Sequence, residues 1–232
     1  MHAKKNLEQA NIDATVLAVV KQVADICISK YPDSDRPVLI AVGGPGGTGK
    51  STFSSKLAKI IDKSKVLRLD NYKTPRSFRK EKGIMGPHPE ANEMELIRWH
   101  LEDIRAGIPF FKPVYDRALG MSDATELYEP AIYNIIDGEV STYEEFKDLV
   151  NISIYIDARK RTQLKTRVTR DVQDKGYSVG KGLKTFWYSN MREFREHGAE
   201  SKEWADIVLF RKVDYSLVMR KPKIKANPSN QR

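Results

Sequence analysis

The chain of 232 residues has only one cysteine, Cys27, so no disulfide can form within it. A single cysteine is typical of proteins kept in a reducing compartment, and we therefore expect a cytoplasmic protein. Cys27 follows Val16, Val20 and Val23 in an apolar pattern with helical spacing. This pattern favours a small buried side chain over a reactive thiol.

Long apolar runs are absent as well. No stretch approaches 18 apolar residues, which excludes a membrane-spanning helix. Residues 1–14 have no apolar run behind their lysines, which excludes a signal peptide. No group of cysteines and histidines has the spacing of a zinc site. With 40% hydrophobic and 9% aromatic residues, the chain still has enough apolar side chains to fold as a globular protein.

Acidic residues are outnumbered by basic ones. There are 31 Asp and Glu against 40 Lys and Arg, for a formal net charge of +9. Such a surplus favours anionic partners. The densest basic runs, residues 76–82 and 220–225, come without a nucleic-acid-binding motif. We therefore predict small polyanions as partners, namely ATP and a phosphorylated substrate, and neither nucleic acid nor a membrane.

The most informative stretch is residues 44–51, GPGGTGKS, which fits the phosphate-binding pattern G-x-x-x-x-G-K-[ST]. An apolar run over 37–42 predicts a strand before it, and a helix is predicted over 50–62. Glycines let backbone N–H groups wrap a phosphate, and the helix N-terminus adds positive potential. Lys50 would reach the β- and γ-phosphates, and the Ser51 hydroxyl would hold Mg²⁺. The predicted ATP-binding residues are Gly44, Gly46, Gly47, Thr48, Gly49, Lys50, Ser51 and Thr52.

The same letters allow a second interpretation. Gly44, Gly46 and Gly49 also spell the dinucleotide pattern G-x-G-x-x-G, and Asp70 ends the next predicted strand about 20 residues later, where a ribose-binding acid would lie. A Rossmann dehydrogenase must therefore be weighed. The Lys50-Ser51 pair argues against it, because a dinucleotide site needs neither a lysine nor a hydroxyl at that point.

Strands and helices alternate along the rest of the chain. This alternation predicts an α/β fold with a parallel sheet of the P-loop type and helices on both faces. The expected strands cover 37–42, 66–69, 131–136, 152–156 and 206–210, and the expected helices 1–30, 50–62, 91–106, 159–175 and 182–197. A polar loop is expected over 70–89. We divide the chain into an N-terminal helix and turn (1–35), a P-loop domain (36–218) and a basic mobile tail (219–232).

Two acids follow predicted strands, where a parallel sheet lines its ligand crevice. Asp70 could accept the proton of an attacking hydroxyl or order Mg²⁺, although a loop-capping role is the alternative. Asp137 stands at the metal-binding position after an apolar strand, with a turn residue before glycine as the alternative. The basic segment 159–171 could close over ATP and neutralise phosphate charge, or form an ordinary solvated face.

Residues 37–210 resemble the phosphoribulokinase/uridine kinase family of P-loop kinases. The resemblance lies in residues 69–72 (LDNY), 79–83 (RKEKG), 89–92 (PEAN), 112–115 (KPVY), 128–130 (YEP), 137–138 (DG), 153–157 (SIYID), 170–171 (RD), 175–178 (KGYS) and 204–206 (WAD). Several of these stretches look especially like the phosphoribulokinase branch. The resemblance implies an ATP-dependent kinase that phosphorylates a hydroxyl of a pentose-like acceptor with Mg²⁺.

The resemblance also implies a role for individual residues. Asp70 matches the catalytic base, and Asp137 stands where the family usually has glutamate as a metal-water ligand. Arg167 and Arg170 fall at or beside the cations of the lid, and with Lys50 complete the predicted catalytic set. The predicted substrate-binding residues are Tyr72, Lys73, Arg79, His88, Tyr115 and Arg117.

The departures from the family bear on the acceptor. Uridine kinases usually have aspartate where Pro87 stands and a base-reading histidine at the position of Gly120. Phosphoribulokinases typically have histidine where this chain has Lys73 and Arg117. The added cations favour an acceptor with phosphate or carboxylate, although they could also be ordinary solvated side chains.

Other functions stay open at this point. A uridine or cytidine kinase is the main alternative, because the family includes both activities. A nucleotide-binding regulatory protein without catalysis is another, since Asp137 and the acceptor pocket differ from the pattern. A GTPase would need Asn-Lys-x-Asp, which the chain lacks. A homo-oligomer stays open as well.

Overall fold

The computed structural model describes residues 2–32 and 34–220, with side chains for all of them except 2–9 and 175. The tail predicted from residue 219 therefore lies outside the described residues from 221 onward. Among the described residues, no helix is both long and apolar enough to cross a membrane.

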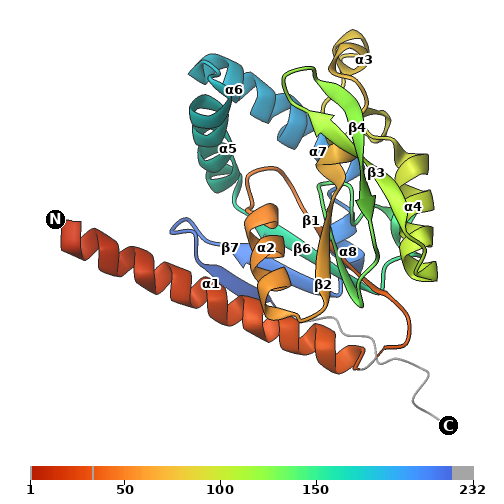
Figure 1. Ribbon diagram of the computed structural model, residues 1–232. Coiled ribbons are helices and arrows are strands. Elements are labelled where there is room, and N and C mark those ends of the chain that lie inside the picture. Colours follow the sequence, from red (N-terminus) through yellow and green to blue (C-terminus); the bar gives the residue numbers. More distant parts are fainter. Residues whose placement is uncertain (1, 33, 221–232) are drawn as a thin grey trace.

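A six-stranded sheet forms the centre of the molecule (Figure 1). Its strands follow the order β2-β5-β1-β6-β7-β8, and all neighbours run parallel except β8, which is antiparallel to β7. The bounds are β1 Val38–Gly43, β2 Ser64–Arg68, β5 Tyr133–Asp137, β6 Ile152–Ala158, β7 Ile207–Arg211 and β8 Leu217–Arg220. The α/β fold with a mostly parallel sheet is confirmed.

Side chains alternate between two cores because successive strand residues point to opposite faces. Val38, Ile40 and Val42 of β1 pack with α1 (His2–Lys30) and α2 (Lys50–Ile60). Leu39 of the same strand belongs to the opposite core, together with α4 (Met94–Ala106) and α7 (Phe194–His197). Helices therefore cover both faces, as predicted, and α8 (Ser201–Trp204) precedes β7.

Two further units rise above the sheet. The helices α5 (Lys160–Lys175) and α6 (Val179–Phe186) pack on one another. A hairpin of β3 (Phe110–Asp116) and β4 (Met121–Tyr128) lies on the opposite side of the molecule from α5 (Figure 1). The phosphate loop follows β1 and precedes α2, so it comes before both of these units in the sequence.

Three segments differ from the sequence prediction. The expected loop over 70–89 contains α3 (Arg76–Glu81), and 3-10 turns cover Leu69–Tyr72 and Pro89–Ala91. Helix α3 buries no side chain, so it has no apolar periodicity to predict it. The hairpin had no predicted strand, because nearly every side chain of β4 is exposed or half-exposed. The helix expected over 182–197 begins at Val179, and its Trp187–Glu193 segment is a π-helix. A further 3-10 turn spans Glu144–Phe146.

Candidate active site

The phosphate loop has the backbone that its glycines allow. Gly44 has a φ of 124°, and a Cβ added there would lie 2.3 Å from the carbonyl oxygen of Ile156 on the neighbouring strand. Gly49 caps α2 in the left-handed conformation, with a φ of 84°. Both positions therefore require glycine. The loop brings its backbone N–H groups and the N-terminus of α2 to the carboxyl edge of β1, which suits a phosphate.

Lys50 is buried at the start of α2, and its Nζ donates to the Pro45 carbonyl oxygen at 3.1 Å. Burial lowers the pKa of Lys50, and the carboxylates of Glu139, Asp137 and Asp70 oppose this effect. The ammonium group therefore faces three acids from two segments: Asp70 follows β2, and Asp137 and Glu139 lie at the end of β5 and just after it. This is the position from which a lysine can reach a bound phosphate.

Asp70 lies in the 3-10 turn that follows β2. Burial among protein atoms alone would raise its pKa, but the cations around it prevail and hold the pKa below its ordinary value. These cations are Lys73, Lys50, Arg170 and Arg117, in decreasing order of effect. Asp70 is nevertheless exposed to solvent. Asp70 is thus an accessible, ionised carboxylate among cations, as a proton acceptor must be at neutral pH.

Asp137 ends β5 next to the N-terminus of α2. Burial raises its pKa, while a hydrogen bond with Ser51 and the charge of Lys50 act in the opposite direction. Its Oδ1 is buried and has no hydrogen-bond partner in the described part of the chain. A carboxylate oxygen left without a partner beside a hydroxyl is a donor set that Mg²⁺ prefers. Ser51 and Asp137 therefore fit the predicted metal.

Helix α5, which carries the predicted lid cations and is called the lid helix below, reaches the phosphate loop through Arg167. Its guanidinium Nη1 donates to Asn190 Oδ1 at 2.5 Å and lies 3.7 Å from Glu139 Oε1. Asn190 in turn donates to the Gly46 carbonyl oxygen at 2.8 Å, which ties the π-helix to the loop. Arg170 lies one helical turn after Arg167, pairs with Asp171 and is half-exposed. Its charge helps to lower the pKa of Asp70.

The acceptor side of the cleft carries the other predicted cations. Lys73 Nζ donates to Gly86 O at 2.8 Å and to Asn92 Oδ1 at 2.7 Å, so its hydrogen-bond partners are neutral. Arg79 Nη2 donates to the Tyr115 hydroxyl at 2.5 Å, which links α3 to the hairpin. Arg117, in the turn of the hairpin, is exposed and contributes to the field at Asp70.

Comparison with known proteins places this geometry in a family. The sequence model of the phosphoribulokinase/uridine kinase family matches residues 39–217. The chain belongs to this family. The match covers strands β2, β5, β6 and β7 and all of β1 except Val38, and it leaves outside α1 and all of β8 except Leu217.

Relatives of this family member include both named activities. The phosphoribulokinase of Synechocystis sp. is 29% identical over 179 residues, which are 75% of this chain and 54% of the relative. The uridine kinase of Clostridium tetani is 29% identical over 183 residues, 76% of this chain and 88% of the relative. The chain thus spans about half the length of the phosphoribulokinases that it matches.

Solved structures of low identity share the fold of this family member. D-glycerate 3-kinase from Cryptococcus neoformans superposes with a TM-score of 0.62 at 12% identity, over 88% of this chain and 99% of that one. At this identity the likeness supports the P-loop kinase fold and says nothing about the acceptor.

Tyr72 and His88 were predicted to bind the substrate, and the structure shows other contacts for both side chains. Tyr72 is completely buried, and its hydroxyl is hydrogen-bonded to His100 Nδ1 at 2.8 Å, so it belongs to the core and offers nothing to a substrate. This position does not support the substrate role predicted for Tyr72, whose side chain is buried at the end of the 3-10 turn Leu69–Tyr72. The His88 ring packs edge-on against His197, at 4.6 Å between the ring centroids.

Three residues at the site had no predicted role. Glu139 faces Lys50, Lys73 and Arg167. The guanidinium of Arg211 lies over Gly49, where an added Cβ would be 2.6 Å from its Cζ, and its buried Nε has no partner in the described residues. Asn190 completes the set. Arg211 ends β7 and Glu139 follows β5, so the rule that strand ends line the crevice could have found both.

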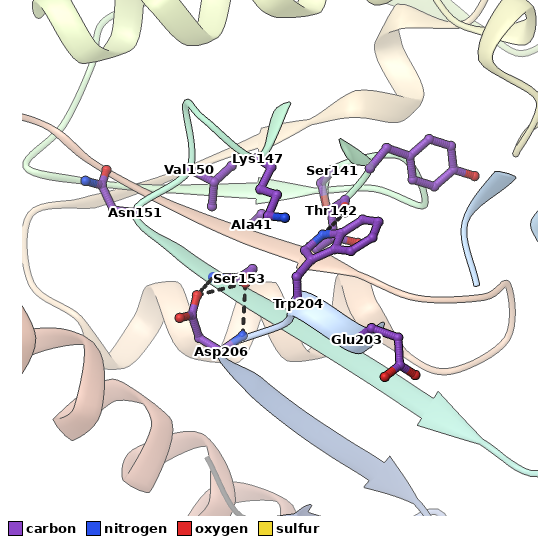
Figure 2. Close-up of a pocket in the computed structure, with 11 residues that line it drawn as sticks. Ala41, Ser141, Thr142, Lys147, Val150, Asn151, Ser153, Glu203, Trp204 and Asp206 are labelled. Carbon is purple, nitrogen blue, oxygen red and sulfur yellow. Dashed lines mark hydrogen bonds between the residues drawn. The ribbon is translucent and has the colours of Figure 1, made fainter. Parts of the chain in front are cut away.

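A pocket of about 580 Å³ lies away from these groups (Figure 2). It is lined by residues between β5 and β6 and by Trp204 and Asp206 before β7, and none of its lining residues was predicted for the site. Asp206 accepts hydrogen bonds from the backbone N–H and the hydroxyl of Ser153, both at 2.8 Å. The family-like stretch 204–206 thus secures the start of β6. The candidate active site is therefore the phosphate loop with the side chains around it, and not this pocket.

Proposed function

We propose that this chain is a kinase that transfers the γ-phosphoryl group of Mg·ATP to a hydroxyl of a small acceptor. The observation that carries the proposal is that Lys50, Asp70 and Asp137 lie close together at the carboxyl ends of the parallel strands, beside a phosphate loop. A nucleotide-binding regulator would need the loop and Lys50, but it would have no use for an accessible, ionised carboxylate such as Asp70 among cations.

The proposed reaction follows from what each side chain can do. The Asp70 carboxylate takes the proton of the acceptor hydroxyl while the hydroxyl oxygen forms its bond to the γ-phosphorus. The bond between this phosphorus and the oxygen shared with the β-phosphate breaks, and ADP leaves. Lys50 and Arg167 stabilise the negative charge on the transferring group. Ser51 and Asp137 would hold Mg²⁺, which neutralises phosphate charge when it is bound.

The acceptor that fits best is a pentose-like sugar phosphate. Lys73, Arg79 and Arg117 supply three cations on the acceptor side. The hydrogen-bond partners of Lys73 are neutral, so only the nearby carboxylates of Asp70 and Glu139 oppose its charge. A carboxylate acceptor would be recognised by the same charges. Glu139 adds one negative charge on this side, so the pocket is suited to an acceptor that also presents hydroxyl groups.

A nucleoside acceptor is the second candidate, since the uridine kinase of C. tetani is a relative. Two observations count against it. Gly120 has a φ of 77°, and an added Cβ would lie 2.9 Å from Arg76 Cβ, so position 120 has no room for a base-reading side chain. Pro87 has no side-chain acceptor for ribose hydroxyls, and its carbonyl oxygen is taken by the Tyr143 hydroxyl at 2.8 Å.

Location and assembly stay predictions. We propose a reducing compartment such as the cytoplasm on the strength of the single cysteine, which the fold buries. Small anions, and no nucleic acid, are the proposed partners. A homo-oligomer is left to measurement by light scattering.

The decisive experiment is ADP release from Mg·ATP with a panel of acceptors: ribulose 5-phosphate, ribose 5-phosphate, glycerate, uridine and cytidine. We expect stimulation by a phosphosugar. Asp70→Asn should lower turnover at least 100-fold and leave ATP binding nearly unchanged, because the amide cannot take the proton. Asp123→Asn, at an exposed site on β4, is the matched control.

Three results would redirect the proposal. Near-normal turnover in Asp70→Asn would remove Asp70 as the base. Stimulation by uridine alone would favour the nucleoside branch. Tight ATP binding without stimulation by any acceptor would favour the regulatory protein.

A further inference from the structure

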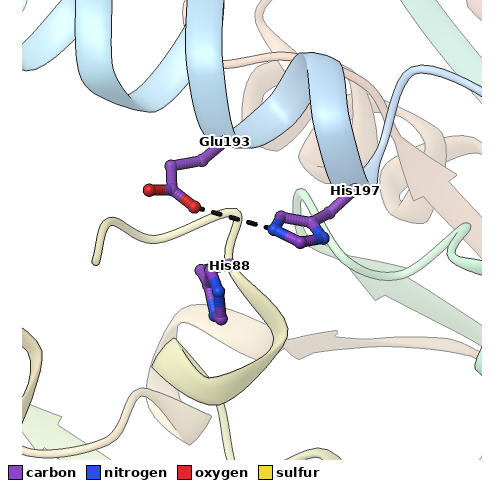
Figure 3. Close-up of side chains that lie close together, drawn as sticks. All are labelled: His88, Glu193 and His197. Carbon is purple, nitrogen blue, oxygen red and sulfur yellow. Dashed lines mark ion pairs between the residues drawn. The ribbon is translucent and has the colours of Figure 1, made fainter. Parts of the chain in front are cut away.

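Two histidines and a glutamate from distant parts of the chain lie close together at the loop between α3 and α4. This loop, residues 82–93, is called the acceptor loop below. His88 lies just before the 3-10 turn Pro89–Ala91, while Glu193 ends the π-helix and His197 ends α7. One ligand atom from each of the three side chains lies within 4.8 Å of the other two. Figure 3 shows the three side chains close together, with the His88 ring below the ion pair of Glu193 and His197. None of them has a part in the proposed phosphoryl transfer.

The distances suit a metal ion. His197 Nε2 lies 3.8 Å from Glu193 Oε2, and the rings of His88 and His197 are 4.6 Å apart at 72°. Ligand atoms at about 2.0–2.2 Å from a tetrahedral zinc ion are about 3.4 Å apart. Small side-chain rotations, on the order of 1 Å at the ligand atoms, would therefore bring all three into coordination.

Glu193 gives an independent reason to expect a cation. Its side chain is only 3% exposed, and its one ion-pair partner within the described residues is His197. A buried carboxylate is costly unless a cation or several hydrogen bonds compensate it. A divalent ion at the common centre would supply that compensation.

His88 has one competing interaction. Its Nδ1 accepts the Glu90 backbone N–H at 3.2 Å, and ligation would end this bond, either by using Nδ1 directly or by placing a proton on it. The bond is long and exposed, so water can replace the imidazole as acceptor. Metal binding would therefore cost little through the loss of this hydrogen bond.

We propose that His88, Glu193 and His197 form a binding site for a borderline divalent cation such as Zn²⁺, with the fourth position open to water. Two imidazoles and one carboxylate select zinc-like metals, whereas Mg²⁺ prefers an all-oxygen set such as Ser51 and Asp137. The bound ion cross-links the acceptor loop to the helices that hold Asn190 against the phosphate loop. The site thus restrains the same loop whose Gly86 carbonyl receives Lys73.

The test is metal binding itself, which does not depend on kinase activity. The untagged full chain carries His2→Asn, which removes the histidine next to the N-terminus, and excess Mg²⁺ occupies the oxygen site. We expect Zn²⁺ titration calorimetry to give one equivalent, Co²⁺ to give visible absorption of a four-coordinate site, and Zn²⁺ to raise the thermal midpoint. His197→Gln and Glu193→Gln should each weaken Zn²⁺ binding at least tenfold.

Glu196→Gln is the matched control, since Glu196 is an exposed acid on the same short helix. If Glu193→Gln does not fold, His197→Gln carries the test, because His197 is partly exposed and tolerates the change more easily. The proposal is overturned if the parent chain binds no Zn²⁺ under these conditions. It is equally overturned if His197→Gln binds as tightly as Glu196→Gln.

Discussion

Two aspartates at the candidate active site, Asp70 and Asp137, have pKa values shifted in opposite directions. Asp70 and Asp137 are both aspartates at strand ends, yet the pKa of Asp70 lies below the ordinary value and that of Asp137 above it. Cations outweigh burial at Asp70, and burial outweighs the hydrogen bond and the lysine at Asp137. The first carboxylate therefore stays ionised and ready to accept a proton. The second gains by receiving a divalent cation, which would compensate its buried charge.

This difference predicts a trade-off between stability and metal binding at Asp137. The folded pKa of Asp137 is raised, so the stability it contributes is present below the ordinary pKa and is lost as the pH rises through the raised value. Asp137→Asn removes that loss. We expect a higher thermal midpoint than the parent at pH 7 in the presence of EDTA, and a much weaker dependence of ADP release on Mg²⁺.

Thermal unfolding from pH 4 to 8 measures the first effect, and the difference between the two chains should shrink toward acid. Asp123→Asn should leave both properties unchanged, because Asp123 is exposed on β4. A parent chain more stable than Asp137→Asn at pH 7 would contradict the cause given for the shift.

Among the elements, the π-helix over Trp187–Glu193 is the one that couples lid and loop. Its wider turn brings Asn190 into the buried space between α5 and the phosphate loop, where it is bonded to Gly46, Gln163 and Arg167. Single π-helical turns are frequent at functional sites. Here the turn aligns one amide with three partners from two distant segments.

Asn190→Ala therefore removes three hydrogen bonds at once. Because it leaves buried groups on Gly46 and Arg167 without this partner, we expect a loss of about 1–3 kcal/mol in the free energy of unfolding. Arg167 is released from its position, so ATP binding should weaken several-fold. Urea unfolding and ATP titration measure the two effects.

Arg192→Gln serves as the control, because Arg192 is an exposed residue of the same π-helix. Equal ATP affinity in Asn190→Ala and the parent would show that the lid is positioned by other contacts.

At the scale of the molecule, α1 lies outside the residues that match the family and yet shares the core of the sheet. Val16, Val20 and Val23 of α1 are buried in the same cluster as β1 and α2. The Tyr133 hydroxyl donates to the Tyr31 carbonyl oxygen at 2.8 Å, which links the end of α1 to β5. The division of the chain at residue 35 remains a prediction, and these contacts bear on how independent the two parts are.

A matched pair of substitutions tests the contribution of α1. Val20 is fully buried, whereas Leu17 on the same helix is 41% exposed. Val20→Ala should lower the free energy of unfolding by about 1–3 kcal/mol, through lost burial and the cavity that remains. Leu17→Ala should change it by less than about 0.5 kcal/mol. Urea unfolding measures both. Similar small effects would show that α1 does not stabilise the core.

Features that depend on neighbouring residues could be predicted before the structure was known. The phosphate loop was predicted because glycines, Lys50 and Ser51 must follow one another for backbone N–H groups, an ammonium and a hydroxyl to meet one phosphate. The parallel sheet was predicted because its buried strands are continuous apolar runs, which local composition reveals. Asp70 and Asp137 could be predicted as site residues for the same reason, since each follows such an apolar run in the sequence.

Contacts between side chains that are far apart in the sequence could be found only in the folded chain. Tyr72 follows Asp70 by two residues but turns into the core, and no local pattern distinguishes it from a substrate residue. Glu139, Asn190 and Arg211 join the site through strand ends and one helical turn. His88, Glu193 and His197 have no metal-site spacing in the sequence, because their proximity comes from packing a loop against a helix. Contacts of this kind depend on the whole fold, so the fold alone reveals them.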